Sequence, residues 1–297
     1  PLSRRQRQMC IRDSMNIKQF NDWLSSDNKQ SLIMGILNVT PDSFSDGGQY
    51  FDKNVAVEHA LAMIRNGANI IDIGGESTRP FSDPVSLDEE ISRVIPVIKG
   101  IREKSDVCIS IDTTKSMVAS EALHVGASII NDVSAMEVDP FMADIAVKFD
   151  CPIIIMHMKG TPKNMQDNPT YESLISDIKN YLIKRIDYAV SKGVHRKKII
   201  IDPGIGFGKT VENNFEIINN LNHFVKLNFP VLLGASRKSF IGIALNLPEN
   251  ERLEGSLAAN IIGLQQGVKI FRVHDVAETY KALFIANKIY NSNHLIS

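Results

Sequence analysis

The sequence predicts a single-domain α/β protein built as a closed (β/α)8 barrel, and two observations carry this prediction. From residue 31 onward, short apolar runs alternate with longer amphipathic runs, which is typical of parallel strands joined by crossover helices. Eight such strand-then-helix units follow one another in about 260 residues, a length that matches a closed barrel. No linker rich in Pro, Gly or Ser divides them, so we expect one domain.

The predicted strands are short, mainly apolar runs, as expected for parallel strands that are buried on both faces. The predicted strands are residues 31–38, 69–74, 107–112, 128–132, 152–157, 198–202, 230–235 and 269–274. The predicted helices are residues 55–66, 87–103, 116–125, 140–149, 171–192, 211–227, 252–266 and 276–290. A doubly wound open sheet would use the same alternation, but it usually has fewer strands and reverses at a switch point, so we prefer the barrel.

The first 14 residues differ from the rest of the chain. They carry four arginines against one acid, Asp13, and show no helical or strand periodicity. No apolar stretch follows this basic cluster, which disfavours a secretory signal. We therefore expect residues 1–14 to be a non-native or disordered extension and residues 15–297 to form the barrel domain. Residues 16–29 place Phe20 and Trp23 on one helical face, and we expect this extra helix to cover the bottom of the barrel.

The composition argues against several classes of protein. The 33 Lys and Arg residues nearly balance the 34 Asp and Glu residues, so binding to nucleic acid through bulk charge is not expected. The chain has no apolar run near the roughly 18 residues that a membrane helix needs. Its three cysteines form no C-x-x-C pair, which suggests neither a disulfide framework nor a cysteine zinc site. We expect a cytoplasmic protein that binds no nucleic acid and no membrane.

Polar residues interrupt the apolar strands at their C-terminal ends, where barrel enzymes have their active sites. They are Asn38, Asp72, Asp112, Asn131, Asp132, His157, Asp202, Ser236, Lys238, Arg272 and His274. Asp and Asn also cap helices, but capping does not suit Lys238, Arg272 or His157. Because converging charged groups are costly without a ligand, we predict the active site at this end.

Two alternating pairs predict an anion pocket. Residues two apart in an extended segment point the same way, so Ser236 and Lys238 would present donors to one spot, as would Arg272 and His274. Arg suits bidentate contact with phosphate, and Lys and His add further donors.

A second set of residues predicts a heterocycle. The carboxylates of Asp112 and Asp202 can each accept two N–H bonds from a guanidine-like edge, and Asn131 supplies both a donor and an acceptor. A pterin or a purine has such an edge. The residues alone therefore indicate a phosphorylated heterocycle and do not identify the reaction.

The segment DPGIGFGKT at residues 202–210 invites a phosphate-loop interpretation, because a strand leads into a Gly-rich turn. Pro203 stands where a Walker A loop needs its first Gly, so we prefer a tight turn beside a ligand. The histidines and carboxylates form no metal-ligand motif. We expect any metal to be Mg²⁺, held partly by substrate phosphates.

With these residues in place, the sequence resembles the dihydropteroate synthases from about Leu32 to the last helix. The resemblance rests on LNVTPDSFSDGG (37–48), DIGGESTRP (72–80), SIDT (110–113), INDVS (130–134), MHMKGTP (156–162), DPGIGFGKT, GASRKSFIG (234–242) and RVHDV (272–276), in this order. It implies a (β/α)8 barrel and the condensation of 6-hydroxymethyl-7,8-dihydropterin pyrophosphate with para-aminobenzoate in folate biosynthesis. It also implies an S_N1-like transfer, a Mg²⁺ cofactor and a homodimer.

The resemblance also implies a role for each matching residue. The pterin would be bound by Asp112, Asn131, Met156, Asp202, Gly206, Phe207 and Lys238. The pyrophosphate would be bound by Asn38, Arg79, Arg272 and His274, with Asn38 also a ligand of Mg²⁺. Para-aminobenzoate would be bound by Phe44, Thr78, Arg79, Pro80, Phe207 and Ser236. Of these residues, Lys238, Arg272 and His274 would take part in catalysis.

The connections at residues 39–50 and 75–86 are longer than the two to six residues that such loops usually have, so we expect them to act as lids. Phe44 and Phe81 give these polar loops an apolar residue to bury. Phe81 stands where the family pattern leads us to expect a small residue, which bears on sensitivity to sulfonamides. We expect Glu76 and Ser77 to serve the structure of the second loop.

Two other functions share this kind of barrel. A methyltransferase acting from methyltetrahydrofolate to a corrinoid partner would keep the heterocycle acids but has no need of the STRP, SRK and RVH segments. A catalytically silent pterin-binding paralogue would show an eroded anion pocket, which this sequence does not. Both remain as alternatives to the synthase.

Overall fold

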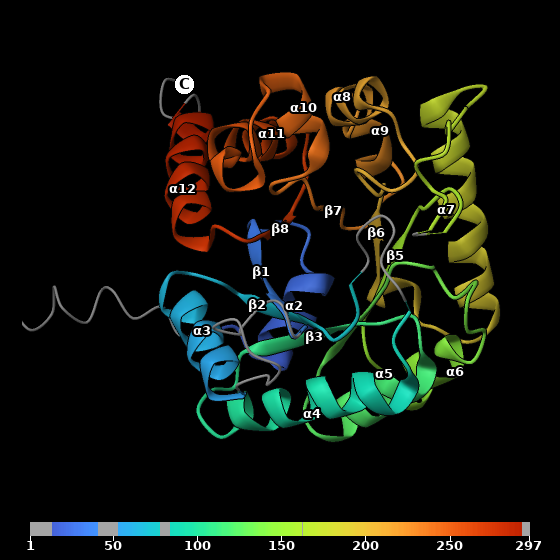
Figure 1. The fold of residues 1–297 in the computed structure, drawn as a ribbon, viewed down its shortest axis with the longest axis vertical. Coiled ribbons are helices and arrows are strands. Elements are labelled where there is room, and N and C mark those ends of the chain that lie inside the picture. The colour runs from blue at the N-terminus through green and yellow to red at the C-terminus, as the bar shows by residue number, and fades with distance from the viewer. Residues whose placement is uncertain (1–13, 41–52, 78–83, 162, 293–297) are drawn as a thin grey trace, which may run out of the picture.

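The computed structural model describes residues 14–40, 53–77, 84–161 and 163–292, and it confirms the predicted barrel (Figure 1). The strands are β1 (Leu32–Asn38), β2 (Ile70–Gly74), β3 (Cys108–Asp112), β4 (Ile129–Asp132), β5 (Ile153–Met156), β6 (Ile199–Asp202), β7 (Leu232–Leu233) and β8 (Ile270–Val273). They pair in parallel in the order β6-β5-β4-β3-β2-β1-β8-β7. A parallel bridge between Ile201 and Val231 joins β6 to the start of the β7 segment and closes the barrel.

Helices surround the strands, and each predicted helix is present. They are α2 (Ile17–Ser25), α3 (Lys53–Arg65), α4 (Leu87–Arg102), α5 (Ser116–His124), α6 (Met142–Lys148), α7 (Leu174–Ser191), α8 (Val211–Asn219), α9 (Asn222–Val225), α10 (Ser239–Leu245), α11 (Leu253–Gln265) and α12 (Val276–Ser292). Short 3-10 helices occupy Arg196–Lys198 and Glu249–Glu251. No helix in the described part of the chain is long and apolar enough to cross a membrane.

Two differences from the predicted helices concern short elements. The stretch predicted as one helix at residues 211–227 is divided into α8 and α9, because α8 ends at the non-helical Asn220. Helix α10 was not predicted. It has seven residues and ends at Asn246 in the left-handed conformation, so it is too short for a clear helical period.

The alternation of side chains along the strands divides the barrel interior into two layers. Each strand contributes one residue to an apolar lower layer, made of Leu32, Ile70, Cys108, Ile129, Ile154, Ile200, Leu232 and Ile270. The side chains two residues further along point the same way. On five strands these are polar or charged, namely Asp72, Ser110, Asn131, Asp202 and Arg272. The polar layer therefore lies inside the barrel, directly above the apolar one.

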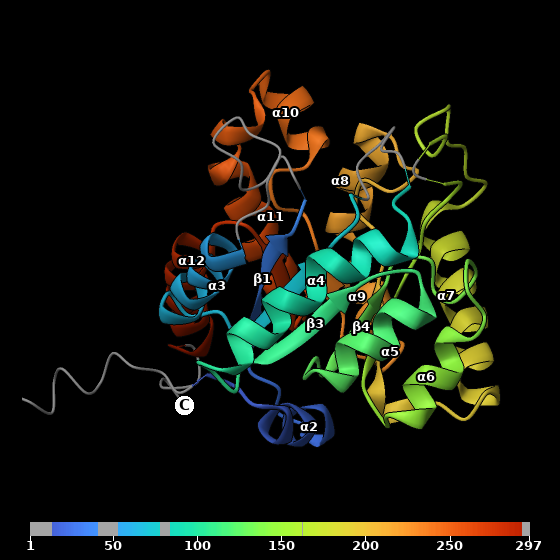
Figure 2. The same ribbon diagram turned by 60° about the horizontal axis from the view of Figure 1, so that its bottom comes forward.

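Helix α2 closes the lower end of the barrel, as expected from its two aromatic residues. Phe20 is fully buried, and its ring stacks on Trp23 with centroids 5.5 Å apart. Both pack against the apolar lower layer. Figure 2 shows α2 beneath the strands, at the opposite end of the molecule from α10. The helix begins at Asn16, which forms a reciprocal capping box with Gln19.

Candidate active site

Arg272 lies at the centre of the polar layer, held by two acids from other strands. Its Nε donates to Asp72 Oδ2 at 2.6 Å and its Nη2 donates to Asp112 Oδ2 at 2.8 Å. Asn131 Nδ2 also donates to Asp72 Oδ2, at 3.1 Å. All three partners of this network, Asp72, Asp112 and Asn131, are buried. The structure thus brings together one predicted anion-binding residue and two predicted heterocycle-binding residues.

Asp72 is the member of this network that was predicted to line neither binding pocket. It stands out in the sequence only as one of many polar residues at strand ends. Its position in the strand could have indicated that it faces the barrel interior. Asp72 comes two residues after Ile70, just as Asn131 comes two residues after Ile129 and Asp202 two residues after Ile200. Its role becomes apparent only from its contact with Arg272, which lies 200 positions later in the sequence.

The pKa values in this layer are set by burial, which disfavours charged groups, and by the ion pairs, which favour them. Burial raises the pKa of Asp112 to about 7, although Arg272 opposes the shift. Burial also works against the charge of Arg272, but Asp72 and Asp112 outweigh it and raise the pKa of the guanidinium above its usual value. Arg272 therefore stays charged, while Asp112 can exchange a proton near neutral pH.

Asp202, Lys238 and Phe207 form the second part of the site, beside the Gly-rich turn after β6. Asp202 Oδ1 accepts the N–H of Gly204 at 2.7 Å. Lys238 Nζ donates to Ile205 O at 2.6 Å and lies 4.0 Å from the centroid of the Phe207 ring, within cation–π range. Burial lowers the pKa of Lys238 to about 7, against the attraction of Asp202.

Gly206 is required by the position of Lys238. Its φ is +82°, a conformation that L side chains rarely adopt. A Cβ at this position would lie 2.9 Å from Lys238 Cδ. The glycine therefore lets the backbone approach the lysine closely, which agrees with the interpretation of 202–210 as a tight turn beside a ligand.

Ser236 and Lys238 do not point to one spot in the way that the sequence predicted. The intervening Arg237 has a φ of +56°, so the segment is not extended and the rule for alternating residues does not apply. Ser236 Oγ instead lies 3.0 Å from His274 Nδ1, while Lys238 turns to the loop after β6. Arg237 forms a two-point ion pair with Asp275 that ties the connection after β7 to the one after β8.

Asp132 and His157 lie outside the site, contrary to the prediction that all strand-end polar groups converge. Each directly follows an inward-facing residue, so its side chain points outward to the helices. Asp132 accepts the N–H groups of Ser134 and Met136 and shapes the turn after β4. The His157 ring packs edge-on against Tyr181, with centroids 4.9 Å apart.

Asn38 and Met156 occupy the expected ends of their strands. Asn38 is the last residue of β1, partly exposed and in register with Gly74 of β2. Met156 ends β5 in register with Asp202 and is buried. Among the described residues, no group of three or more His, Cys, Asp or Glu side chains forms a metal cage.

Four of the residues predicted to bind para-aminobenzoate lie outside the described residues, as does Phe81. The four are Phe44, Thr78, Arg79 and Pro80. The start of the second loop is described, and there Lys115 forms ion pairs with Glu76 and with the buried Glu90. Arg93 Nη1 donates to Gly75 O at 2.6 Å. Glu76 therefore does serve the structure of this loop.

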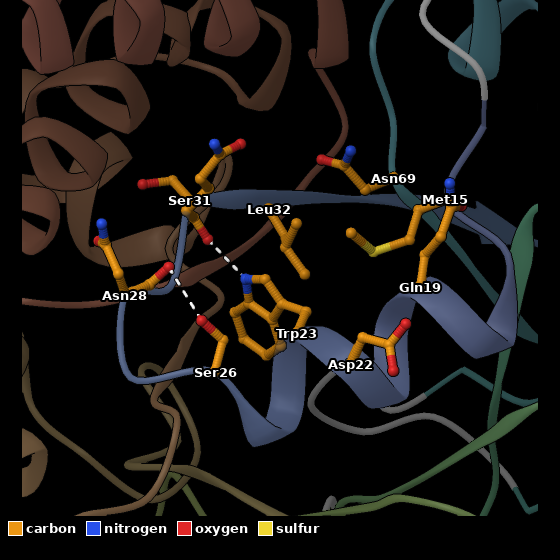
Figure 3. Close-up of a pocket in the computed structure, with 10 residues that line it drawn as sticks. Met15, Gln19, Asp22, Trp23, Ser26, Asn28, Ser31, Leu32 and Asn69 are labelled. Carbon is orange, nitrogen blue, oxygen red and sulfur yellow. Dashed lines mark hydrogen bonds between the residues drawn. The ribbon is translucent and has the colours of Figure 1, made fainter.

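A pocket of about 480 Å³ lies at the other end of the barrel, beside α2 (Figure 3). Its wall is held by local hydrogen bonds, from Trp23 Nε1 to Gln30 O at 2.8 Å and from Ser26 Oγ to Asn28 O at 3.3 Å. None of the predicted site residues lines it. The pocket is separated from the polar layer by the apolar lower layer of the barrel.

Comparison with known proteins gives consistent results. Residues 34–274 match the model of a family described as pterin binding enzyme. The dihydropteroate synthase of Clostridium beijerinckii is 51% identical over 86% of this chain and 92% of its own length. The synthase of Escherichia coli K12 is 45% identical over 90% of this chain and 94% of its own length.

Solved structures give the same result. A Yersinia pestis dihydropteroate synthase, solved with a sulfonamide drug complex, superposes with a TM-score of 0.85 and 42% identity, covering 90% of this chain and 96% of that one. A Xanthomonas albilineans synthase in complex with 7,8-dihydropteroate gives a TM-score of 0.80 and 37% identity, covering 88% and 94%. The chain is thus similar in sequence and in fold to the same group of enzymes.

Proposed function

The chain belongs to the family of pterin binding enzymes, and on this premise we propose how its residues carry out the dihydropteroate synthase reaction. The reaction joins 6-hydroxymethyl-7,8-dihydropterin pyrophosphate to para-aminobenzoate and releases 7,8-dihydropteroate and pyrophosphate. The observation that carries the proposal is the layer at the C-terminal ends of the strands, where the buried Asp112, Asn131 and Asp202 gather with the half-buried Lys238 and Arg272.

The pterin is bound by the acids and the amide of this layer. Asp112 and Asp202 accept the N–H groups of the heterocycle edge, and Asn131 matches a donor and an acceptor. Lys238 donates to a ring acceptor, and Met156 lines the apolar side of the ring with Gly206 and Phe207. The burial of Asp112, Asn131 and Asp202 supports this assignment, because burying polar groups in a barrel interior is costly and hydrogen bonds to a ligand would offset that cost.

The pyrophosphate is bound at the mouth of the barrel by Asn38, Arg79, Arg272 and His274. Arg272 is oriented by Asp72, and His274 by Ser236. The partly exposed oxygen of Asn38 is a suitable ligand for Mg²⁺, an ion that is usually held by few protein groups together with substrate phosphates and water. When bound, Mg²⁺ supplies positive charge that neutralises the pyrophosphate.

Para-aminobenzoate is bound by Phe207 and Ser236, together with Phe44, Thr78, Arg79 and Pro80, which lie outside the described residues. The burial of Ser236 beside His274 supports this placement, because it puts a hydroxyl next to the proposed pyrophosphate pocket.

The chemistry needs charge stabilisation and positioning more than a nucleophile from the protein. The bond between the pterin methylene carbon and the pyrophosphate oxygen breaks first, and the electron pair leaves with the pyrophosphate. The ring nitrogens delocalise the positive charge, and the guanidinium of Arg272 together with His274 stabilises the leaving group. The amine of para-aminobenzoate then attacks the methylene carbon and loses a proton to water, with the pocket holding both partners in place.

An assay with purified components tests this proposal. The protein starting at Met15 is incubated with the dihydropterin pyrophosphate, labelled para-aminobenzoate and Mg²⁺, and labelled dihydropteroate is measured. We expect product only when every component is present, and no product from an Asp202→Ala variant. A wild-type protein that binds pterin without forming product would instead identify a silent pterin-binding paralogue.

We also propose a homodimer in the cytoplasm. Helix α12 exposes Phe284, Ile285, Ile289 and Tyr290, and the neighbouring α11 exposes Ile262. Such a group of apolar side chains on two adjacent helices supports an interface between two copies of the chain. The reduced thiols of Cys108 and Cys151 support a reducing compartment.

A further inference from the structure

The loop after β6 is held by an unusual set of contacts. Four consecutive backbone carbonyl groups each accept a hydrogen bond from a side chain. Three of these side chains come from other parts of the chain, and one belongs to the loop itself. The pairs are Ile205 O with Lys238 Nζ at 2.6 Å, Gly206 O with Gln166 Nε2 at 2.8 Å, Phe207 O with Lys209 Nζ at 2.9 Å and Gly208 O with Tyr171 OH at 2.6 Å. The loop is therefore fixed residue by residue.

Lys209 is the one charged side chain of this set that no part of the proposed reaction uses. Its side chain is buried, only 2% exposed. The Nζ atom faces three acceptors, Phe207 O at 2.9 Å, His157 Nδ1 at 2.9 Å and His157 O at 3.3 Å. An ammonium group has three donors, so this environment satisfies all of them. Burial nevertheless lowers the pKa of Lys209 well below its usual value, although Asp202 favours the charged form.

The three acceptors connect Lys209 to the pterin pocket. Phe207 carries the ring beneath Lys238 Nζ, and its carbonyl is fixed by Lys209. His157 follows Met156, and its own N–H donates to Asp202 O at 3.0 Å. Lys209 thus joins the backbone beneath Phe207 to the ends of β5 and β6, where two residues of the proposed pterin pocket lie.

His157 is suited to this contact because it stays neutral. Burial, together with the nearby positive charge of Lys209, lowers its pKa to about 2. With Nδ1 accepting from Lys209, the ring proton lies on Nε2. The ring is wedged between Tyr171 and Tyr181, at centroid distances of 6.1 and 4.9 Å, so it offers Lys209 a fixed acceptor.

We propose that Lys209 is a positioning residue of the active site, which fixes the Phe207 ring beneath Lys238 and so holds the pterin pocket in its binding shape. The inference rests on the proposed role of Phe207 and Lys238 in binding pterin. Burying a lysine destabilises the fold, and an apolar residue of the same length would fill the space without that destabilisation. The three directed hydrogen bonds are what such a residue cannot supply.

The test compares Lys209→Met, which keeps the length and loses the donors, with Tyr171→Phe, which removes the donor to the neighbouring Gly208 O. Binding of 6-hydroxymethylpterin is measured by calorimetry, and KM and kcat are measured for both substrates. We expect Lys209→Met to weaken pterin binding by roughly tenfold and to raise KM for the dihydropterin substrate more than KM for para-aminobenzoate. We expect Tyr171→Phe to stay within about threefold of wild type in both measurements.

Several outcomes would overturn the inference. Wild-type pterin affinity in a folded Lys209→Met variant would do so, as would equal losses in Lys209→Met and Tyr171→Phe, since general loosening of the loop would then explain both. If Lys209→Met does not fold, Lys209→Leu, which also lacks the donors, is measured in the same way, and wild-type affinity in that variant rejects the inference. An inactive wild-type protein would count against the proposed function instead, and the Asp202→Ala variant shows whether the assay reports on the pterin pocket.

Discussion

Asp72 on β2 holds Arg272 on β8, with Nε of the guanidinium 2.6 Å from Oδ2 of the acid. Strand β1 lies between the two strands in the sheet, so the pair links two strands that do not pair with each other. Asp72 is fully buried and bonds only within this polar layer among the contacts described above. It sets the direction in which Arg272 presents its remaining N–H groups.

Replacing Asp72 by Asn tests this relationship. The Asn side chain has nearly the same shape but removes the charge that pairs with Arg272. A hydrogen bond to a charged group contributes about 1.5–3 kcal/mol, so we expect kcat/KM to fall by roughly 10- to 100-fold. Steady-state kinetics measures the effect. The control is Asp106→Asn, an exposed aspartate before β3, which should keep wild-type kinetics. Unchanged kcat/KM in Asp72→Asn would show that Asp112 alone can orient Arg272.

Lys238 gives the ligand-free protein a stability that depends on pH. Its pKa is lowered to about 7 in the folded protein, mainly by burial, while an unfolded lysine has a pKa near 10.4. Between these values the unfolded chain binds more protons, so the stabilising contribution is present above pH 10 and is lost as pH falls toward 7. We expect the free energy of unfolding to rise more between pH 7 and about 9 in wild type than in Lys238→Met.

Urea denaturation at several pH values measures this difference. Lys209 is present in both proteins, so its contribution cancels in the comparison. Parallel pH profiles for the two proteins would mean that Lys238 keeps an ordinary pKa in the folded state.

Phe20 is expected to stabilise the fold without contributing to catalysis. It is fully buried between α2 and the lower layer of the barrel, so Phe20→Ala should cost about 3–5 kcal/mol of unfolding free energy. The kcat of the folded protein should stay at the wild-type value, because the site lies at the other end. Ile17→Ala is the matched control, since Ile17 lies on the same helix but is exposed. A large fall in kcat for Phe20→Ala would show that the two layers are coupled.

The exposed apolar side chains of α12 predict the assembly of the protein. Ile289 is 66% exposed, and Ile289→Glu should convert a dimer to a monomer in sedimentation velocity measurements. Val147→Glu places the same charge on an exposed apolar position of α6 and should leave the dimer intact. A wild-type protein that sediments as a monomer would contradict the proposal.

The fold could be predicted from the sequence because the same pattern of an apolar run and an amphipathic run occurs eight times. Eight apolar runs and eight amphipathic runs each carried a period, and the errors are confined to short pieces such as α10 and the break at Asn220. These have too few residues for a period to be visible. The plug formed by Phe20 and Trp23 was predicted from one apolar face, which had to be buried against something.

The site was predicted less completely, because the type of residue at the end of a strand does not determine which way its side chain points. Asn131 and Asp132 are adjacent and both polar, yet one faces the interior and the other a turn. The left-handed conformation of Arg237 makes the side chains of Ser236 and Lys238 point in different directions, and no local sequence pattern predicts this conformation. The roles of Asp72 and Lys209 depend on partners distant in sequence, and they became visible only when the strands were placed side by side.

The pairing of Arg272 with the two acids also has a consequence for how the protein is made. Its partners Asp72 and Asp112 precede it by 200 and 160 positions. Because a chain leaves the ribosome from its N-terminus, both acids emerge well before the cation that neutralises them. Enclosing them without that cation would be costly, so we expect the nascent barrel to stay open at its upper end until the eighth strand is made. The last strand to be translated would then complete the enclosure and the catalytic centre in one step.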